Sequence, residues 1–214
     1  MYKKILLLLC FCSHQVFAAD CSDASGTTVT ISTSCTGGLS FSGDVTNLTI
    51  NSGITIDKAG KGAVSIGDNT VTTLTNNGTI KTTSSHYGLR HTGSGLITTL
   101  INNGSITAAE RYGLSTGSSA TITTITNSGT ISAGSHSGLR NFRGEIGTIT
   151  NSGTISAGTQ YGLINNSGTI GTVTNSGTIS SGGAGGAGGA DDNSDGDDDY
   201  DNGLWNDGTI TKLT

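Results

Sequence analysis

The densest group of residues that could hold a metal ion is an acidic run near the C-terminal end of the chain. The run opens with acidic or amide residues at alternate positions followed by Gly, which is how a calcium-binding loop begins. The candidate oxygen ligands are Asp191, Asn193, Asp195, Asp197 and Asp199. The twelfth position holds Asn202 instead of the bidentate Glu that such a loop requires. The run therefore predicts at most a weak calcium site, and a solvated loop of like charges is the favoured interpretation.

The other residues with catalytic chemistry do not form a catalytic pattern. The histidines beyond the N-terminal segment are His86, His91 and His136. A nucleophilic triad needs a unique His held by an acid beside a Ser. His86 and His136, however, share one position of an internal repeat with an Arg and a Gln, which is typical of a surface column. Glu110 and Glu145 fall at different phases of this repeat, so a paired-carboxylate glycosidase site is unsupported. We expect no enzyme activity and no cofactor.

The composition restricts the folds that could position these residues. Of 214 residues, 35 are Gly, none is Pro, and 12% are charged, whereas about a quarter of an average soluble domain is charged. A chain of this kind cannot build an ordinary helical core, while Thr favours strands and Gly and Asn favour turns. The formal net charge is −5, with no basic stripe and no basic amphipathic helix. We therefore expect neither a nucleic-acid partner nor membrane-surface binding.

The N-terminus has the pattern of a signal peptide over residues 1–18. Lys3 and Lys4 precede the apolar run 5–12, and Ala18 and Ala19 supply small residues for cleavage. The apolar run is too short to span a bilayer. We therefore expect the mature chain to leave the cytoplasm.

Export would change the meaning of the four cysteines. Cys10 and Cys12 would leave with the signal peptide, so Cys21 and Cys35 would remain. In an oxidising compartment this pair predicts a disulfide, whereas a metal site would need further ligands.

A repeat dominates the middle of the chain. The pattern Asn-(Asn/Ser)-Gly-(Thr/Ser)-Ile occurs five times at a nearly constant step. Its first residues are Asn76, Asn102, Asn127, Asn151 and Asn175, and its last are Ile80, Ile106, Ile131, Ile155 and Ile179. A Tyr-Gly-Leu element and an Ile-x-x-apolar-x-Asn element recur between them.

The spacing within one period predicts the fold. From Leu100 to Ile106 every second residue belongs to the repeated set, which is the alternation of a strand and not the period of a helix. Short strands joined by bends within about 25 residues describe one rung of a solenoid. We predict an all-β protein, a single-stack right-handed parallel β-helix with rungs of about 25 residues. The isoleucines should form an interior column, and the Asn amides should hydrogen-bond from rung to rung.

This pattern divides the chain into five predicted segments. They are a signal peptide at 1–18, a capping segment at 19–62, β-helix repeats at 63–180, a Gly/Asp-rich loop insertion at 181–201 and a partial final rung at 202–214. The final residues match an earlier rung and stop one residue before the next repeated Asn is due. We therefore expect a truncated or fragmentary gene product.

Together, these features resemble the passenger domains of autotransporters, the exported β-helical parts of Gram-negative type V secretion proteins. The resemblance rests on the signal pattern, the Cys-bounded Thr/Ser segment that runs into Gly43–Ile50, and the Asn-x-Gly-x-Ile rungs. It implies a chain at the cell surface or in the extracellular space that binds a host or bacterial surface ligand. The family's outer-membrane translocation barrel is not found in this sequence, and without it the expected location is the periplasm.

Three functions compete on this fold. We favour an adhesin-like scaffold that displays its surface for binding, with a column of Tyr87, Tyr112 and Tyr161 as a candidate contact strip. The first alternative is a β-helix enzyme that acts on polysaccharide. The second is an ice-binding solenoid, which needs paired threonines in every rung. Adjacent pairs such as Thr123-Thr124 become Gly-Thr in later rungs, which speaks against it.

Overall fold

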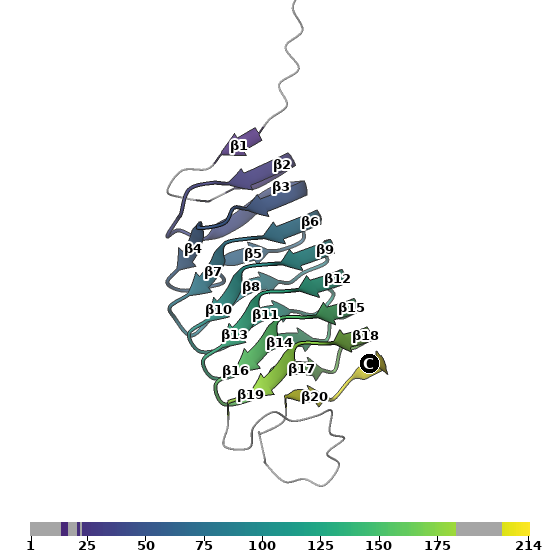
Figure 1. Cartoon of the computed structure of the whole chain (residues 1–214). Coiled ribbons are helices and arrows are strands. Elements are labelled where there is room, and N and C mark those ends of the chain that lie inside the picture. Colours follow the sequence, from purple (N-terminus) through teal and green to yellow (C-terminus); the bar gives the residue numbers. More distant parts are fainter. Residues whose placement is uncertain (1–13, 17–20, 22, 183–202) are drawn as a thin grey trace, which may run out of the picture.

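The protein is a β-solenoid in which each turn of the chain passes through three short strands (Figure 1). The computed structural model describes residues 14–16, 21, 23–182 and 203–214, and this part of the chain contains no helix. Successive turns stack through parallel strand pairs along the long axis of the molecule. The predicted fold class is confirmed, since residues one predicted period apart are paired with each other in adjacent rungs.

The three strands of each turn build three faces, which we name in chain order. The first face contains β2 (Ala24–Ile31), β3 (Leu39–Ile50), β6 (Val71–Asn76), β9 (Leu96–Asn102), β12 (Thr121–Asn127), β15 (Glu145–Asn151), β18 (Thr169–Asn175) and β21 (Thr209–Leu213). The second face contains β4 (Thr55–Lys58), β7 (Thr79–Thr82), β10 (Ser105–Ala108), β13 (Thr130–Ala133), β16 (Thr154–Ala157) and β19 (Thr178–Ser181). The third face contains β5 (Val64–Ile66), β8 (Tyr87–His91), β11 (Tyr112–Thr116), β14 (Ser137–Phe142), β17 (Leu163–Asn166) and β20 (Leu204–Asn206).

One strand joins two of these faces. The start of β3 pairs with β5 on the third face, and its end pairs with β6 on the first face. The first and third faces therefore form one 15-stranded sheet, while the second face is a separate six-stranded sheet. A further strand, β1 (His14–Val16), falls within the predicted signal peptide and pairs in parallel with β2.

Columns of identical or similar apolar side chains fill the interior. Ile80, Ile106, Ile131 and Ile155 are fully buried, each paired with the next, and Ile179 is partly buried at the end of this column. The third face contributes Leu89, Leu114, Leu139 and Leu163, and the first face contributes Leu74, Leu100, Ile125, Ile149 and Val173, all without exposed surface. A rung cannot shield these side chains alone, so burial requires stacking.

The predicted disulfide is confirmed, and it lies at the N-terminal end of this core. The sulfur atoms of Cys21 and Cys35 are bonded, and both residues are buried. Cys35 also forms a parallel bridge with Ile56, which places it in line with the isoleucine column of the second face. The bridge thus ties the segment before β2 to the first turn of the solenoid.

A continuous ladder of asparagines, buried except for the last, Asn175, marks the first corner, where the first face turns into the second. Nδ2 of Asn102 donates to Oδ1 of Asn127 at 2.7 Å and to the carbonyl oxygen of Thr130, which belongs to the next rung, at 3.0 Å. The same amide-to-amide bond joins Asn76 to Asn102, Asn127 to Asn151, and Asn151 to Asn175, at 2.7 to 2.8 Å. Gly follows two residues later because the corners touch: a Cβ on Gly104 would overlap the carbonyl oxygen of Gly78.

A second ladder, which the sequence analysis did not anticipate, occupies the second corner, where the third face turns into the first. Nδ2 of Asn141 donates to Oδ1 of Asn165 at 2.9 Å, and Nδ2 of Asn165 donates to Oδ1 of Asn206 at 2.7 Å. In the two preceding rungs the same column holds His91 and Thr116. The second ladder is therefore incomplete.

The insertion ends where the rung register resumes. The five calcium-ligand candidates, residues 191–199, lie outside the described residues. On the far side, Leu204 pairs with Leu163 and Ile210 pairs with Ile170. No long apolar helix capable of crossing a membrane occurs in the described segments.

Candidate ligand-binding face

The outward surfaces of the first and second faces carry mainly hydroxyl groups. On the first face the register aligns two outward columns, Thr73, Thr99, Thr124, Thr148 and Thr172, and Thr75, Ile101, Thr126, Thr150 and Thr174. The second face aligns Thr79, Ser105, Thr130, Thr154 and Thr178, and Lys81, Thr107, Ser132, Ser156 and Ser180. Its one charged contact joins Lys81 Nζ to Asp57 Oδ2 at 3.4 Å, within the part of the chain that the structure describes. These faces repeat with little variation.

The threonine pairs of the first face differ from the pairs that the sequence analysis considered. Adjacent residues such as Thr123 and Thr124 are not the repeating pair, because the register passes from Ile122 directly to Thr124. The pair that repeats consists of residues two apart, such as Thr124 and Thr126, which lie on either side of the buried Ile125. The irregularity expected for the adjacent pair is present, since Gly147 and Gly171 stack over Thr123, whereas the pair two residues apart is regular in the middle of the solenoid except at Ile101.

The third face, in contrast, carries cations and aromatic rings. Its outward column is Ser65, Arg90, Ser115, Arg140, Ile164 and Trp205. A second outward column contains Tyr87 and Tyr112, whose rings stack with centroids 5.6 Å apart. Further along, Tyr161 stacks on Trp205 at 5.8 Å, and the ring of His136 meets Tyr112 edge-on at 5.5 Å. The predicted tyrosine column thus includes a His ring beside the rung in which Ser137 replaces Tyr.

Aromatic rings hold the two arginines of the column. Cζ of Arg140 lies 4.7 Å from the ring centroid of Tyr112 and 4.3 Å from that of Phe142. Cζ of Arg90 lies 5.4 Å from the ring centroid of Tyr87. A guanidinium that stacks on rings uses its faces and leaves its in-plane N–H groups available to other partners. Neither arginine forms an ion pair with any residue that the structure describes.

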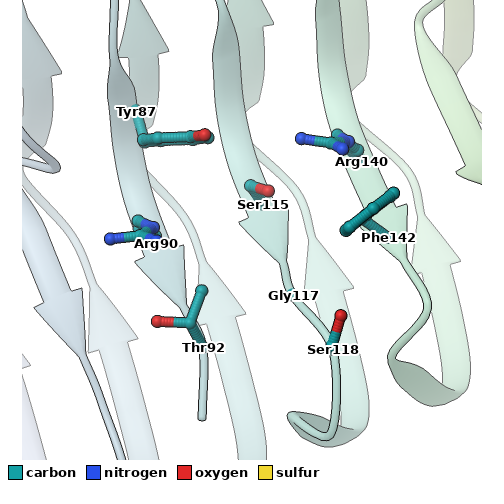
Figure 2. Close-up of a pocket in the computed structure, with 8 residues that line it drawn as sticks. All are labelled: Tyr87, Arg90, Thr92, Ser115, Gly117, Ser118, Arg140 and Phe142. Carbon is teal, nitrogen blue, oxygen red and sulfur yellow. The ribbon is translucent and has the colours of Figure 1, made fainter.

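A groove of about 350 Å³ opens between these arginines. Figure 2 shows Arg90 and Arg140 on either side of Ser115, with Tyr87 and Phe142 beside them. Ser115 is only 3% exposed and forms the floor. The eight lining residues include no carboxylate. The groove therefore presents guanidinium edges, hydroxyls and ring surfaces, a combination suited to an anionic ligand with an apolar face.

His91 lies behind this groove, next to Arg90 in the chain, and is fully buried in the second corner. Its Nε2 lies 3.0 Å from the carbonyl oxygen of Gly95 and 3.2 Å from that of Thr121, and its Nδ1 lies 3.2 Å from the carbonyl oxygen of Ile66. Burial lowers the pKa of His91, although these carbonyl contacts oppose the shift. A neutral ring has one N–H, so one of its nitrogens faces a carbonyl without a hydrogen to donate.

The second-corner column that contains His91 also has unsatisfied hydrogen-bonding atoms in the rungs after it. In the next rungs, Oγ1 of Thr116 and Oδ1 of Asn141 are buried without a hydrogen-bond partner among the described residues. In the complete ladder the equivalent oxygen accepts a bond from the amide of the preceding rung. The break therefore arises because Thr116 has no amide to offer.

The remaining catalytic candidates lie apart. Glu110 is exposed in the turn before β11, whereas Glu145 begins β15 on the first face. His86 lies beside the Ser85 hydroxyl at 3.4 Å, and His136 lies against Tyr112. Within the described ranges no cluster of three or more His, Cys, Asp or Glu side chains is placed to hold a metal ion. The structure thus brings arginines together with the rings of the predicted tyrosine column.

A smaller hollow of about 280 Å³ lies at the second corner beside Arg143 and Glu145. Arg143 has a φ of 56°, and Ser119 and Ser167 take similar left-handed values in the preceding and following rungs. Asp68, in the equivalent corner turn near the N-terminal end, accepts hydrogen bonds from the backbone N–H and hydroxyl of Ser94. These bonds lower the pKa of its carboxyl group.

Comparisons with models of protein families, with curated proteins and with solved structures returned no match. The proposed function therefore rests on the sequence and geometry of this chain alone.

Proposed function

We propose that this chain is an exported, adhesin-like scaffold that binds a surface ligand through its third face and does not act by catalysis. The observation that carries the proposal is the contrast among the faces. Two faces repeat hydroxyl groups, whereas the third gathers arginines clamped by aromatic rings around a groove. Aromatic and Arg side chains are the residues that most often dominate binding energy at interfaces.

Export is supported by the signal-peptide pattern and by the Cys21–Cys35 disulfide, since disulfides persist in oxidising compartments. The rod shape also suits display, because binding groups can be presented at many heights along one side (Figure 1). The autotransporter resemblance agrees with both features.

The test is a binding assay on the purified full chain. Retention would be measured on immobilised bacterial and host-cell surfaces and on a glycan array. A third-face variant, Tyr112→Ser with Phe142→Ser, should lose most of the retention. The control is a first-face variant, Thr124→Ser with Thr148→Ser, which should retain it. Absence of retention on every surface, or equal retention by both variants, would contradict the proposal.

A second candidate, ice binding, is favoured by one specific observation, the paired threonine columns of the first face. Thr124 and Thr126 have equivalents in the rungs on both sides, except that Ile101 replaces one threonine. The spacing of parallel strands, about 4.8 Å, arranges these hydroxyl groups at a regular interval. The test is the thermal hysteresis of the full chain, the difference between the melting and freezing points of ice. A difference that Thr124→Lys abolishes would support ice binding, and no difference would contradict it.

A further inference from the structure

Within the described segments, the two arginines of the third face have no acidic partner. Arg90 and Arg140 are partly buried, and no described residue forms an ion pair with either. The known interactions of Arg140 are with the ring faces of Tyr112 and Phe142. The rings therefore orient the positive charge, which is partly desolvated and which no residue in the described part of the chain neutralises.

We propose that the groove between Arg90 and Arg140 binds an acidic glycan, one whose sugars bear carboxylate or sulfate groups. This inference rests on the proposed function and names its ligand class. Each guanidinium offers two parallel N–H donors to two oxygens of a carboxylate or sulfate group, and the adjoining rings offer apolar surface to the sugar. The serine and threonine hydroxyls between them supply hydrogen bonds to sugar hydroxyl groups.

The spacing suits two acidic groups on one chain. Arg90 and Arg140 belong to β8 and β14, which flank β11, so their backbones are two strand spacings, about 9.6 Å, apart. The volume of about 350 Å³ lies at the small end of ligand sites and fits a short saccharide rather than a protein segment. A ligand with acidic groups on neighbouring sugars could meet both arginines at once.

Preorganisation should make Arg140 bind an anion more tightly than an exposed arginine does. Arg140 is sandwiched between two rings, so less side-chain freedom is lost when it binds an anion. Arg111, by contrast, is exposed, one residue before Tyr112, and does not line the groove. This difference supplies a matched control on the same face.

The test is calorimetric titration of the full chain with two oligosaccharide pairs. One pair is oligogalacturonate and its methyl ester, and the other is a heparin-derived oligosaccharide and its desulfated form. The acidic member of at least one pair should bind at least tenfold more tightly than its neutral counterpart, and added salt should weaken it. The two pairs distinguish carboxylate from sulfate. Equal affinity for acidic and neutral members of both pairs would overturn the inference.

Three variants locate the site. Arg140→Gln should reduce affinity for the acidic oligosaccharide at least tenfold, and Arg140→Lys should also weaken it, because Lys retains the charge but not the fork. Arg111→Gln should bind as the original chain does. Circular dichroism and thermal unfolding of each variant show whether the fold is retained. Unchanged binding by folded Arg140→Gln would overturn the proposal.

Two further arms separate the alternatives. If sodium sulfate or a single-stranded oligonucleotide binds more tightly than both acidic oligosaccharides and depends on Arg140, the groove is an anion site but not a glycan site, and the inference fails. If cell-surface retention persists while neither acidic oligosaccharide binds, the inference fails and the proposed function stands. If retention is also lost from every surface, the proposed function fails.

Discussion

Both polar corners of the solenoid contain a ladder of hydrogen-bonded asparagines, but the ladder of the second corner is shorter. At the first corner, five asparagines pass hydrogen bonds through five successive rungs, from Asn76 to Asn175. At the second corner, the ladder runs only from Asn141 to Asn206, and His91 and Thr116 occupy the rungs before it. The incomplete part lies directly behind the arginine groove, since Arg90, Ser115 and Arg140 are the chain neighbours of these column residues. Proteins often break local rules at functional sites, and the break coincides with the candidate site here.

The largest effect should come from interrupting the complete ladder. Asn127→Ala removes the acceptor for Asn102 and the donor to Asn151, so a buried oxygen loses its partner. We expect the free energy of unfolding to fall by about 3 kcal/mol, measured by urea denaturation. The control is Asn103→Ala, which removes two exposed bonds, to Asn77 and from Ser128, and should change the free energy of unfolding by about 0.5 kcal/mol or less. A loss no larger than that of the control would show that the ladder does not stabilise the first corner.

The same substitution in the incomplete ladder should cost less. Asn141→Ala removes the bond to Asn165, but it also removes a buried oxygen that already lacks a partner among the described residues. We expect a loss of about 1.5 kcal/mol, measured by the same denaturation assay. A cost equal to that of Asn127→Ala would contradict the proposed difference between the two corners.

Repairing the break should stabilise the protein. In Thr116→Asn, the new amide could donate to Oδ1 of Asn141 and extend the second ladder by one rung. We expect a gain of about 1 kcal/mol, seen as a higher melting temperature. Thr116→Val, which removes the unbonded hydroxyl without adding an amide, is the control and should gain less. If Thr116→Asn gains no more than Thr116→Val, the missing amide is not the cause of the break.

The smallest effect should be a dependence on pH at His91. Because the folded-state pKa of His91 is lowered, the unfolded chain takes up a proton first as the pH falls. This contribution to stability is therefore complete above about pH 6.5, the unfolded value, and is lost progressively below it. His91→Asn should flatten the dependence of the melting temperature on pH between about 6.5 and 5. An unchanged slope in His91→Asn would assign it to other groups.

Side chains that repeat at a constant step were readily predicted. The isoleucine column follows from spacing alone, and the asparagines of the first corner have one residue type in five rungs. The pairing of Cys21 with Cys35 followed because only these two cysteines would remain after export to an oxidising compartment. The second corner was missed for two reasons. Its column changes from Ile66 to His91, Thr116 and then Asn, and the step from Asn165 to Asn206 is lengthened because an insertion intervenes.

A usable signal for the second corner was nevertheless present. Asn141 and Asn165 each stand three residues before a Gly, and Asn206 stands two residues before one, with an Ile two residues after each Gly. This is the Asn-Gly-Ile pattern of the first corner, with one added residue in two of the three cases. A search that allowed variable spacing would have found it.

The sequence by itself determined that this chain forms stacked parallel rungs, because an apolar set repeated at a nearly constant step is buried only when the rungs coincide. Tertiary structure alone decided where the arginines meet the rings. The guanidinium of Arg140 packs between Tyr112, which belongs to the preceding rung, and Phe142, which follows on the same strand. That arrangement depends on the lateral register of neighbouring strands and on side-chain direction. The same register places His91 in the interior and Arg90, its neighbour in sequence, at the surface.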